Sequence, residues 1–289
     1  MIAWHRVMID RAYLAPNVKL PAQPRAAKVP EITALFWVIK ILTTGMGEAT
    51  SDWMGGISIA LAAGVGLLGF VFAMWLQFRT PRYVAAIYWF AVMMVAVFGT
   101  MTADGPHKVL GIPYVVTTSG YAIVLAVLFT VWHRSEGTLS IHSIVTRRRE
   151  TFYWLTVLAT FALGTAVGDW TAVSLHLGFF SSGVLFGVAI LVPLAAWWFF
   201  DLNAVAAFWC AYVLTRPLGA SFADWLGKPH SRAGGLGYGD GLIAGIATIV
   251  IGVLVGYLAF TRNDIQPPQE YEPDAASAVT LLPPLPRRD

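Results

Sequence analysis

The sequence predicts an all-α protein, a polytopic membrane helical bundle of eight transmembrane helices arranged as four hairpins. Two observations predict this fold. The chain of 289 residues is 57% hydrophobic and only 12% charged, whereas soluble domains carry about 25% charged residues. In addition, a short motif that contains an acidic residue recurs four times along the chain. The mean hydropathy of +0.66 points the same way.

Eight apolar segments approach the ~20 residues that a membrane helix needs. They are 31–51, 57–77, 84–103, 112–132, 151–169, 178–199, 203–223 and 240–260. They define a membrane domain over residues 28–262. Residues 1–27 lack the continuous apolar stretch of a signal peptide, so we expect a polar cytoplasmic segment. Residues 263–289 are rich in Pro, Asp and Glu, which is typical of a disordered tail.

The positive charges predict the orientation of the chain in the membrane. One set of loops and termini holds Arg6, Arg11, Lys19, Arg25, Lys28, Arg79, Arg82, Arg134, Arg147, Arg148, Arg149 and Arg262. The opposite set holds only Lys108, Lys228 and Arg232. By the positive-inside rule, we expect both termini in the cytoplasm of a bacterium and the chain in its inner membrane.

The recurring motif occupies residues 36–52, 88–104, 153–169 and 208–224. Each copy begins with Phe or Tyr followed by Trp, has Gly ten residues after that Trp, and ends in Asp. The tryptophans are Trp37, Trp89, Trp154 and Trp209; the glycines are Gly47, Gly99, Gly164 and Gly219; the aspartates are Asp52, Asp104, Asp169 and Asp224. Hydrophobic composition alone does not align four aspartates, so the motif indicates an internal repeat.

Each repeat pairs one motif helix with one plainer, glycine-rich helix, over about 28–80, 81–134, 147–200 and 201–262. Because two spans return the chain to the same side, all four repeats share one orientation, unlike the inverted repeats of many transporters. We therefore expect four parallel hairpins with quasi-symmetry about the membrane normal.

With these motif positions, the chain resembles a family of bacterial multi-pass membrane proteins that is defined by a tandem repeat of unknown function. In that family the repeat usually occurs four times, each copy with two membrane helices and a characteristic tryptophan. The resemblance covers about residues 28–262 and implies the membrane topology. It implies no activity, so the function has to be inferred from the residues.

The motif places its polar residues on one stripe of each helix. At ~100° per residue, the positions seven, eleven and fifteen residues after the Trp lie within ~60° of it. They include Glu48, Thr100, Thr165 and the four aspartates. Polar groups facing lipid are costly, so we expect this stripe, with its tryptophans and packing glycines, to face the inside of the bundle. The aspartates then either form a shared cation site or simply cap helices at the headgroup level.

The copies also differ, because the first adds Lys40 and Glu48 and the fourth adds Arg216 followed by Pro217. We expect Glu48 to pair with Arg216 or Lys40 inside the bundle, either for transport or as a structural bridge. Lys40 could instead snorkel to the interface. Pro217 is expected to kink its helix, as in the broken helices of transport sites.

Three histidines follow motif aspartates, at His107, His176 and His230. Carboxylate and imidazole together form a ligand set for a transition metal, although a lone His in a loop is more often simply solvated. The glycine-rich stretch 228–241, which includes Asp240, is interpreted as a re-entrant or lid-like segment.

No enzyme signature is present: the sequence lacks HExxH, GxSxG, CxxC and Rossmann motifs, and the single Cys210 excludes an intrachain disulfide. We therefore expect a transporter and not an enzyme. It would move a small solute or ion through the carboxylates, which favour a cation, either a divalent metal or one whose transport is coupled to protons, with the threonines as neutral oxygen ligands. The expected partners are the bilayer and the transported small ion or solute, with a divalent metal ion as the candidate, and not nucleic acid. The alternatives are a cofactor-binding enzyme or electron carrier, and a structural membrane protein whose aspartates cap helices.

Overall fold

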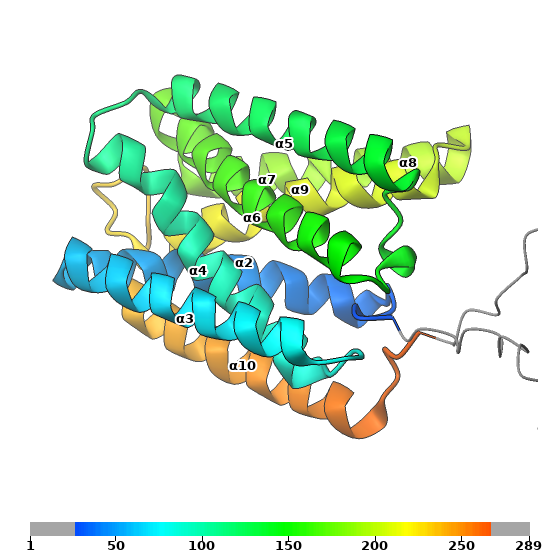
Figure 1. Ribbon diagram of the computed structural model, residues 1–289. Coiled ribbons are helices and arrows are strands. Elements are labelled where there is room, and N and C mark those ends of the chain that lie inside the picture. The colour runs from blue at the N-terminus through cyan, green and yellow to red at the C-terminus, as the bar shows by residue number, and fades with distance from the viewer. Residues whose placement is uncertain (1–26, 267–289) are drawn as a thin grey trace, which may run out of the picture. The chain divides into compact units, whose positions relative to one another are not determined.

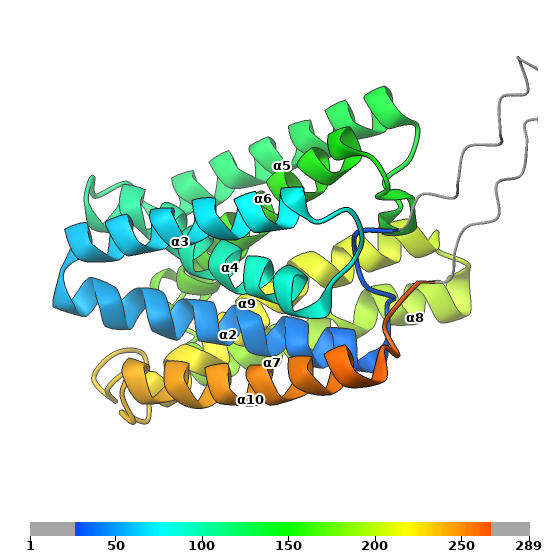
Figure 2. The ribbon, with the colours of Figure 1, turned by 60° about the horizontal axis from the view of Figure 1, so that its bottom comes forward.

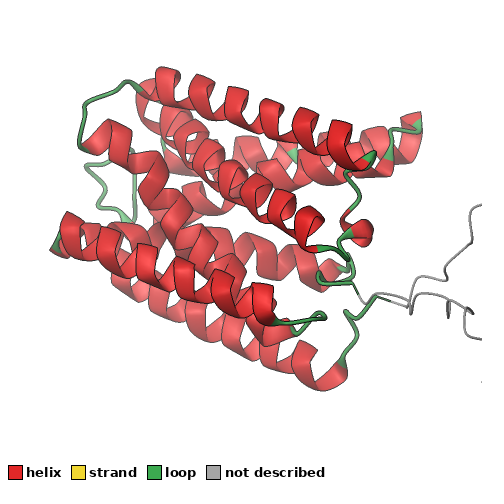
Figure 3. Cartoon of the chain, in the orientation of Figure 1, coloured by secondary structure: helices red, strands yellow, loops and turns green. Residues whose placement is uncertain are grey.

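The computed structural model describes residues 27–266 (Figure 1). Within this range the chain forms helices and loops and no strand (Figure 3), which confirms the all-α prediction. Nearly all of the predicted N-terminal segment and of the predicted C-terminal tail lies outside the described residues. The first and last described residues lie at the same end of the bundle, which we call the terminal end; the opposite end is the far end.

The four copies of the motif form four helices that run from the terminal end to the far end. These are α2 (Ala34–Ile57), α4 (Ala85–Lys108), α6 (Arg147–Asp169) and α9 (Ala204–Gly227). Helix α2 contacts α4, α4 contacts α6, α6 contacts α9, and α9 contacts α2. The four motif helices therefore form a closed inner ring.

The plainer helices lie outside this ring and run in the opposite direction (Figures 1 and 2). They are α3 (Ile59–Arg79), α5 (Tyr114–Glu136), α7 (Phe179–Ala189) with α8 (Leu191–Phe200), and α10 (Asp240–Thr261). Each packs chiefly on the motif helix of the following repeat: α3 on α4, α5 on α6, and α7 on α9. Helix α10 of the last repeat packs chiefly on α2 of the first.

The motif glycines are the points where the inner helices touch. A Cβ added to any of the four would lie under 3.0 Å from the residue seven positions after the Trp in the next copy of the motif. Gly47 meets Ala96, Gly99 meets Phe161, Gly164 meets Arg216, and Gly219 meets Thr44. The missing side chain thus lets each helix approach its neighbour, as small residues do in membrane bundles.

The aromatic pairs that open the motif close the ring near the terminal end. In each case the Phe or Tyr of one copy contacts the Trp of the next. The ring centroids are 5.6 Å apart for Phe36–Trp89, 5.6 Å for Tyr88–Trp154, 6.2 Å for Tyr153–Trp209 and 5.6 Å for Phe208–Trp37. Aromatic contacts at 4.5–7 Å add to the burial of apolar area. The motif tryptophans therefore pack the repeats against each other.

The outer helices expose large apolar side chains, which is the reverse of a soluble protein. Leu68, Ile123, Val192, Ile249 and Phe260 are each more than half exposed. Within residues 27–266, six helices are long and apolar enough to cross a membrane: α3, α4, α5, α6 with its extension to Ser174, α7 with α8, and α10. The exposed apolar faces of these helices fit a membrane protein.

Helices α2 and α9 do not meet the same criterion, although each has 24 residues. The charged residues Lys40 and Glu48 of α2 and Arg216 of α9 lower their mean hydropathy. All three are at most 2% exposed. By length and composition, six of the eight expected spans therefore meet this criterion. The remaining two helices, α2 and α9, carry their charges inside the ring.

Proline acts differently in two of the helices. The expected span 178–199 is divided at Ile190 into α7 and α8, because Pro193 cannot donate to the carbonyl of Ala189. In contrast, α9 continues through Pro217. The end of α6 widens into a π-helical turn, Trp170–Ser174, a feature found often at functional sites.

The glycine-rich stretch after α9, interpreted from the sequence as re-entrant or lid-like, is attached to the end of that helix. Residues 228–239 fold back on the end of α9, with the amides of Leu236, Tyr238 and Gly239 bonded to carbonyls of Trp225, Leu226 and Gly227. Gly235 is required there, because a Cβ would collide with the carbonyl of Lys228.

Residues 27–31 close the terminal end of the ring. Val29 is buried, the amide of Glu31 bonds the carbonyl of Asp264 at 2.8 Å, and Lys28 pairs with the buried Glu150 at 2.5 Å. The Tyr83 hydroxyl donates to the Asp264 carboxylate. Burial raises the pKa of Tyr83, and the bond to Asp264 raises it further. These contacts attach residues 27–31 to the helices at this end.

Candidate functional site

The four motif aspartates lie in the last turns of the inner helices and meet at the far end. Together with Glu48, they form two groups of carboxylates. In each group one oxygen from every residue lies within 4.8 Å of the others. We call Glu48, Asp169 and Asp224 the inner group, and Glu48, Asp52 and Asp104 the outer group; Glu48 belongs to both.

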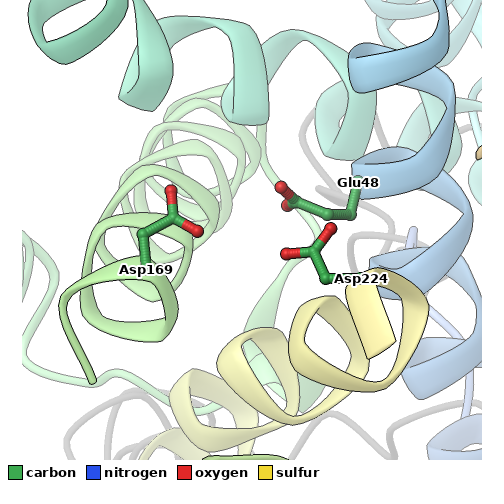
Figure 4. A group of neighbouring side chains, drawn as sticks. All are labelled: Glu48, Asp169 and Asp224. Carbon is green, nitrogen blue, oxygen red and sulfur yellow. The ribbon is translucent and has the colours of Figure 1, made fainter. Parts of the chain in front are cut away.

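The inner group joins three helices (Figure 4): Glu48 comes from α2, Asp169 from α6 and Asp224 from α9, and their carboxyl groups face one another. Glu48 is 2% exposed and Asp224 4% exposed. In the described part of the chain, Oδ1 of Asp224 has no hydrogen-bond partner. A buried carboxylate oxygen without a partner is costly. The unpartnered oxygen therefore favours a positively charged ligand at this group.

Two lysines approach the outer group from the far end. Nζ of Lys108 lies 2.8 Å from Oδ1 of Asp52 and 2.7 Å from Oδ2 of Asp104. Nζ of Lys228 lies 2.6 Å from Oδ2 of Asp52 and 3.0 Å from Oδ2 of Asp240. Burial alone would lower the pKa of Lys228, but the carboxylates of Asp52 and Asp224 outweigh it and raise that pKa above its usual value.

Arg216 joins all four repeats from the centre of the ring. Its Nη2 lies 2.7 Å from Oε2 of Glu48 and 2.6 Å from Oγ1 of Thr165, and it also donates to the hydroxyl of Thr100. Its Nη1 donates to the carbonyl of Thr44 at 2.8 Å. The side chain is completely buried. Of the two partners expected for Glu48, the structure shows Arg216.

Lys40 does not form the ion pair that the sequence suggests, nor does it snorkel. It is 1% exposed, and its Nζ lies 3.9 Å and 4.2 Å from the ring centroids of Phe161 and Tyr212. No hydrogen-bond partner for Nζ lies in the described residues. The aromatic faces of Phe161 and Tyr212 provide its electrostatic stabilisation, whereas Glu48 pairs with Arg216.

The two threonines also differ from their expected role. Thr100 and Thr165 each accept a hydrogen bond from Arg216 and donate one to the carbonyl four residues earlier in their own helix. Their oxygens orient the guanidinium and do not belong to either carboxylate group. As a result, they act on the acidic groups only through Arg216 and Glu48.

The three histidines lie apart from both carboxylate groups. His107 bonds the carbonyl of Ile112 at 2.8 Å and stacks on Tyr114, while His176 and His230 are exposed in loops. Among the described residues, the groups with metal-ligand geometry contain carboxylates only. The structure therefore does not bring the proposed imidazole ligands into either carboxylate group: His107 lies in the last turn of α4 and bonds a backbone carbonyl, and the other two are exposed.

The aspartates also differ from helix caps. Asp52, Asp104 and Asp224 lie inside their helices, and Asp169, at the boundary of α6 and the π-helical turn, makes no capping bond. Within residues 27–266, no backbone amide donates to any of the four carboxylates. The capping interpretation thus has no contact to support it.

The sequence interpretation did not include Lys108, Lys228 and Asp240 in the site. A signal for two of them is present: Lys108 and Lys228 each follow a motif aspartate by four residues, which is one helical turn. Asp240 gives no such signal, because only the folded loop 228–239 brings α10 beside α9.

Comparison with protein families gives one match. Its description is a repeat of unknown function (DUF347), and it matches residues 35–83, 87–138, 152–202 and 207–264. The comparisons with curated proteins and with solved structures gave no significant match. The four matched segments contain the four copies of the motif and cover well over half of the chain. The protein therefore belongs to the family that is defined by this tandem repeat.

Proposed function

We propose that the protein is an integral membrane transporter of a cation, and not an enzyme, in the inner membrane of a bacterium. Cations would bind the inner carboxylate group. One observation carries this proposal: Glu48, Asp169 and Asp224 converge from three helices of a closed ring, and a buried oxygen of Asp224 lacks a partner. Placing ionisable groups inside a membrane bundle costs free energy, and such groups are typically functional.

The membrane topology of this proposal has eight spans in four parallel hairpins. Helices α2 and α9 cross together with the six apolar ones, because the ring formed by α2, α4, α6 and α9 shields their charges from lipid. The cyclic contacts of the glycines and of the aromatic pairs support quasi-symmetry about the membrane normal. In the described residues, Arg79, Arg82, Arg134, Arg147–Arg149 and Arg262 cluster at the terminal end. This asymmetry supports a cytoplasmic location for that end.

The ligand atoms favour a hard cation. Both groups offer carboxylate oxygens and neither sulfur nor nitrogen, which suits Mg²⁺, Ca²⁺ or Mn²⁺. The far end, where the aspartates lie, is the entrance in this state. Arg216 and the ring of aromatic pairs lie between the carboxylates and the terminal end, so release to the cytoplasm requires Arg216 to change its partners.

A flux measurement tests the proposal. Full-length protein in liposomes should take up Mn²⁺, and Asp224→Asn should lower the rate by roughly tenfold or more, equivalent to about 1.4 kcal/mol of lost cation binding. Asp201→Asn is the matched control, because Asp201 is exposed at the terminal end in a left-handed conformation that suits Asn.

Two other results would contradict the proposal. In a structural protein, Asp224→Asn would lower the yield of folded protein and leave the uptake per folded molecule equal to that of the unaltered chain. In a cofactor-binding enzyme or electron carrier, the purified protein would show a haem or flavin absorption band.

A further inference from the structure

The outer carboxylate group differs from the inner one in holding an ammonium. Nζ of Lys108 bonds Asp52 and Asp104 at 2.8 and 2.7 Å. Glu48 belongs to the same group, with an oxygen within 4.8 Å of oxygens of both aspartates. Oxygens that bind one Ca²⁺ or Mn²⁺ at 2.0–2.6 Å lie no more than about 5 Å apart. The three carboxylates therefore have the spacing of a cation site.

A second observation indicates that Lys108 does not satisfy this group. Asp104 is 6% exposed, and its Oδ1 has no hydrogen-bond partner in the described part of the chain. The ammonium contacts the other oxygen, Oδ2. A divalent cation supplies more charge than one ammonium and can contact all three carboxylates, so it would satisfy the group better than Lys108 does.

Exposure differs sharply between the lysine and its partners. The side chain of Lys108 is 47% exposed, whereas those of Asp52 and Asp104 are each 8% exposed. Because four methylenes connect the ammonium to the backbone, Lys108 can move outward into solvent while the acids stay in place. Because its departure would leave two buried carboxylates without this cation, we expect Lys108 to leave in exchange for an incoming cation.

Lys228 does not have this freedom. Its side chain is 12% exposed and is shared by Asp52 and Asp240, which joins α2 to α10. The backbone of the loop 228–239 is itself fastened to the end of α9. Lys228 therefore acts as a structural clamp beside the outer group, and Lys108 is the group that can leave.

We propose that Glu48, Asp52 and Asp104 form a second cation site, which the ammonium of Lys108 fills in this state and from which a hard divalent cation displaces it. This inference rests on the proposed function and deepens it: the substrate class is a divalent cation with oxygen ligands. The incoming ion exchanges with a tethered ammonium before it reaches the inner group, with which the outer group shares Glu48.

The test counts bound Mn²⁺ on the purified full-length protein, with free Mn²⁺ measured by electron paramagnetic resonance at subsaturating to saturating concentrations. The unaltered chain should bind one tight ion, in the inner group, and a second ion only at higher Mn²⁺, because that ion has to displace Lys108. Lys108→Met, with the ammonium removed, should bind both ions tightly, a twofold rise in the number of tight ions. Arg232→Met removes an exposed cation at the same end and is the matched control; it should leave the number at one.

A further variant assigns the additional ion. Adding Asp104→Asn to Lys108→Met should return the number to one, and Lys108→Gln replaces Lys108→Met if the latter does not fold. One ion in both the unaltered chain and Lys108→Met, with equal affinity, overturns this inference and leaves the proposed function intact. No bound ion in either protein overturns both.

Discussion

At the scale of single residues, Arg216 explains why the repeats differ. Burying an ion costs several kcal/mol after relaxation, and this guanidinium is fully buried. One carboxylate, Glu48, supplies the opposite charge, and Thr100 and Thr165 supply neutral acceptors at the equivalent positions of the second and third repeats. A carboxylate at each of these three positions would leave two of them without a cation.

This account predicts a double-mutant effect. Arg216→Met leaves Glu48 buried without its partner and should lower the free energy of unfolding by about 3–5 kcal/mol. Combining it with Glu48→Gln removes the remaining charge and should recover part of that loss. Reversible unfolding in mixed micelles measures both values. A double variant no more stable than Arg216→Met would show that Glu48 does not depend on the guanidinium.

At the scale of helices, the glycines set the spacing of the inner ring. Gly219 is the tightest position, because a Cβ there would collide with the side chain of Thr44 and with the carbonyl of Ile41 at 2.7 Å. The carbonyl belongs to the backbone of α2 and cannot move without moving that helix. Since α2 and α9 carry Glu48 and Arg216, the glycine also determines how close the ion pair lies.

Gly219→Ala should therefore lower the free energy of unfolding by about 1–3 kcal/mol, the usual effect of overpacking. Gly252→Ala in α10 is the control, because nothing lies within 4 Å of a Cβ at that position. It should leave stability unchanged or raise it slightly, since Ala favours a helix over Gly. Thermal unfolding followed by circular dichroism separates the two, and equal midpoints would contradict the close approach of α2 and α9.

The helices also show what sequence reasoning could and could not predict. The four motif helices and the role of their glycines were predictable, because recurrence and helical periodicity are local properties of a sequence. The two prolines were not distinguishable: Pro193 ends α7, whereas Pro217 lies inside a continuous α9 against Gly164 and Gly168. The packing of the neighbouring helices determines whether a helix continues through its proline, and a single sequence does not show that packing.

At the scale of the whole molecule, the bundle is apolar outside and charged inside, and its carboxylate groups lie at the far end. The convergence of the aspartates was predictable from four copies with one orientation. The contacts of Lys108 and Lys228 with the outer group were not predictable, because these lysines lie outside the motif and reach across repeats. Lys108 of the second repeat, for example, contacts Asp52 of the first repeat. The burial of Lys40 against aromatic rings likewise depends on which helices are neighbours.

The most direct test of the central claim is the position of a bound ion. Crystals of the full-length protein grown with Mn²⁺ should show an anomalous scattering peak among Glu48, Asp169 and Asp224, about 2.0–2.6 Å from their carboxylate oxygens. That peak should be lost in Asp224→Asn. Ordered density for all three side chains without a peak among them, at a Mn²⁺ concentration that saturates uptake, would contradict a cation site in the inner ring.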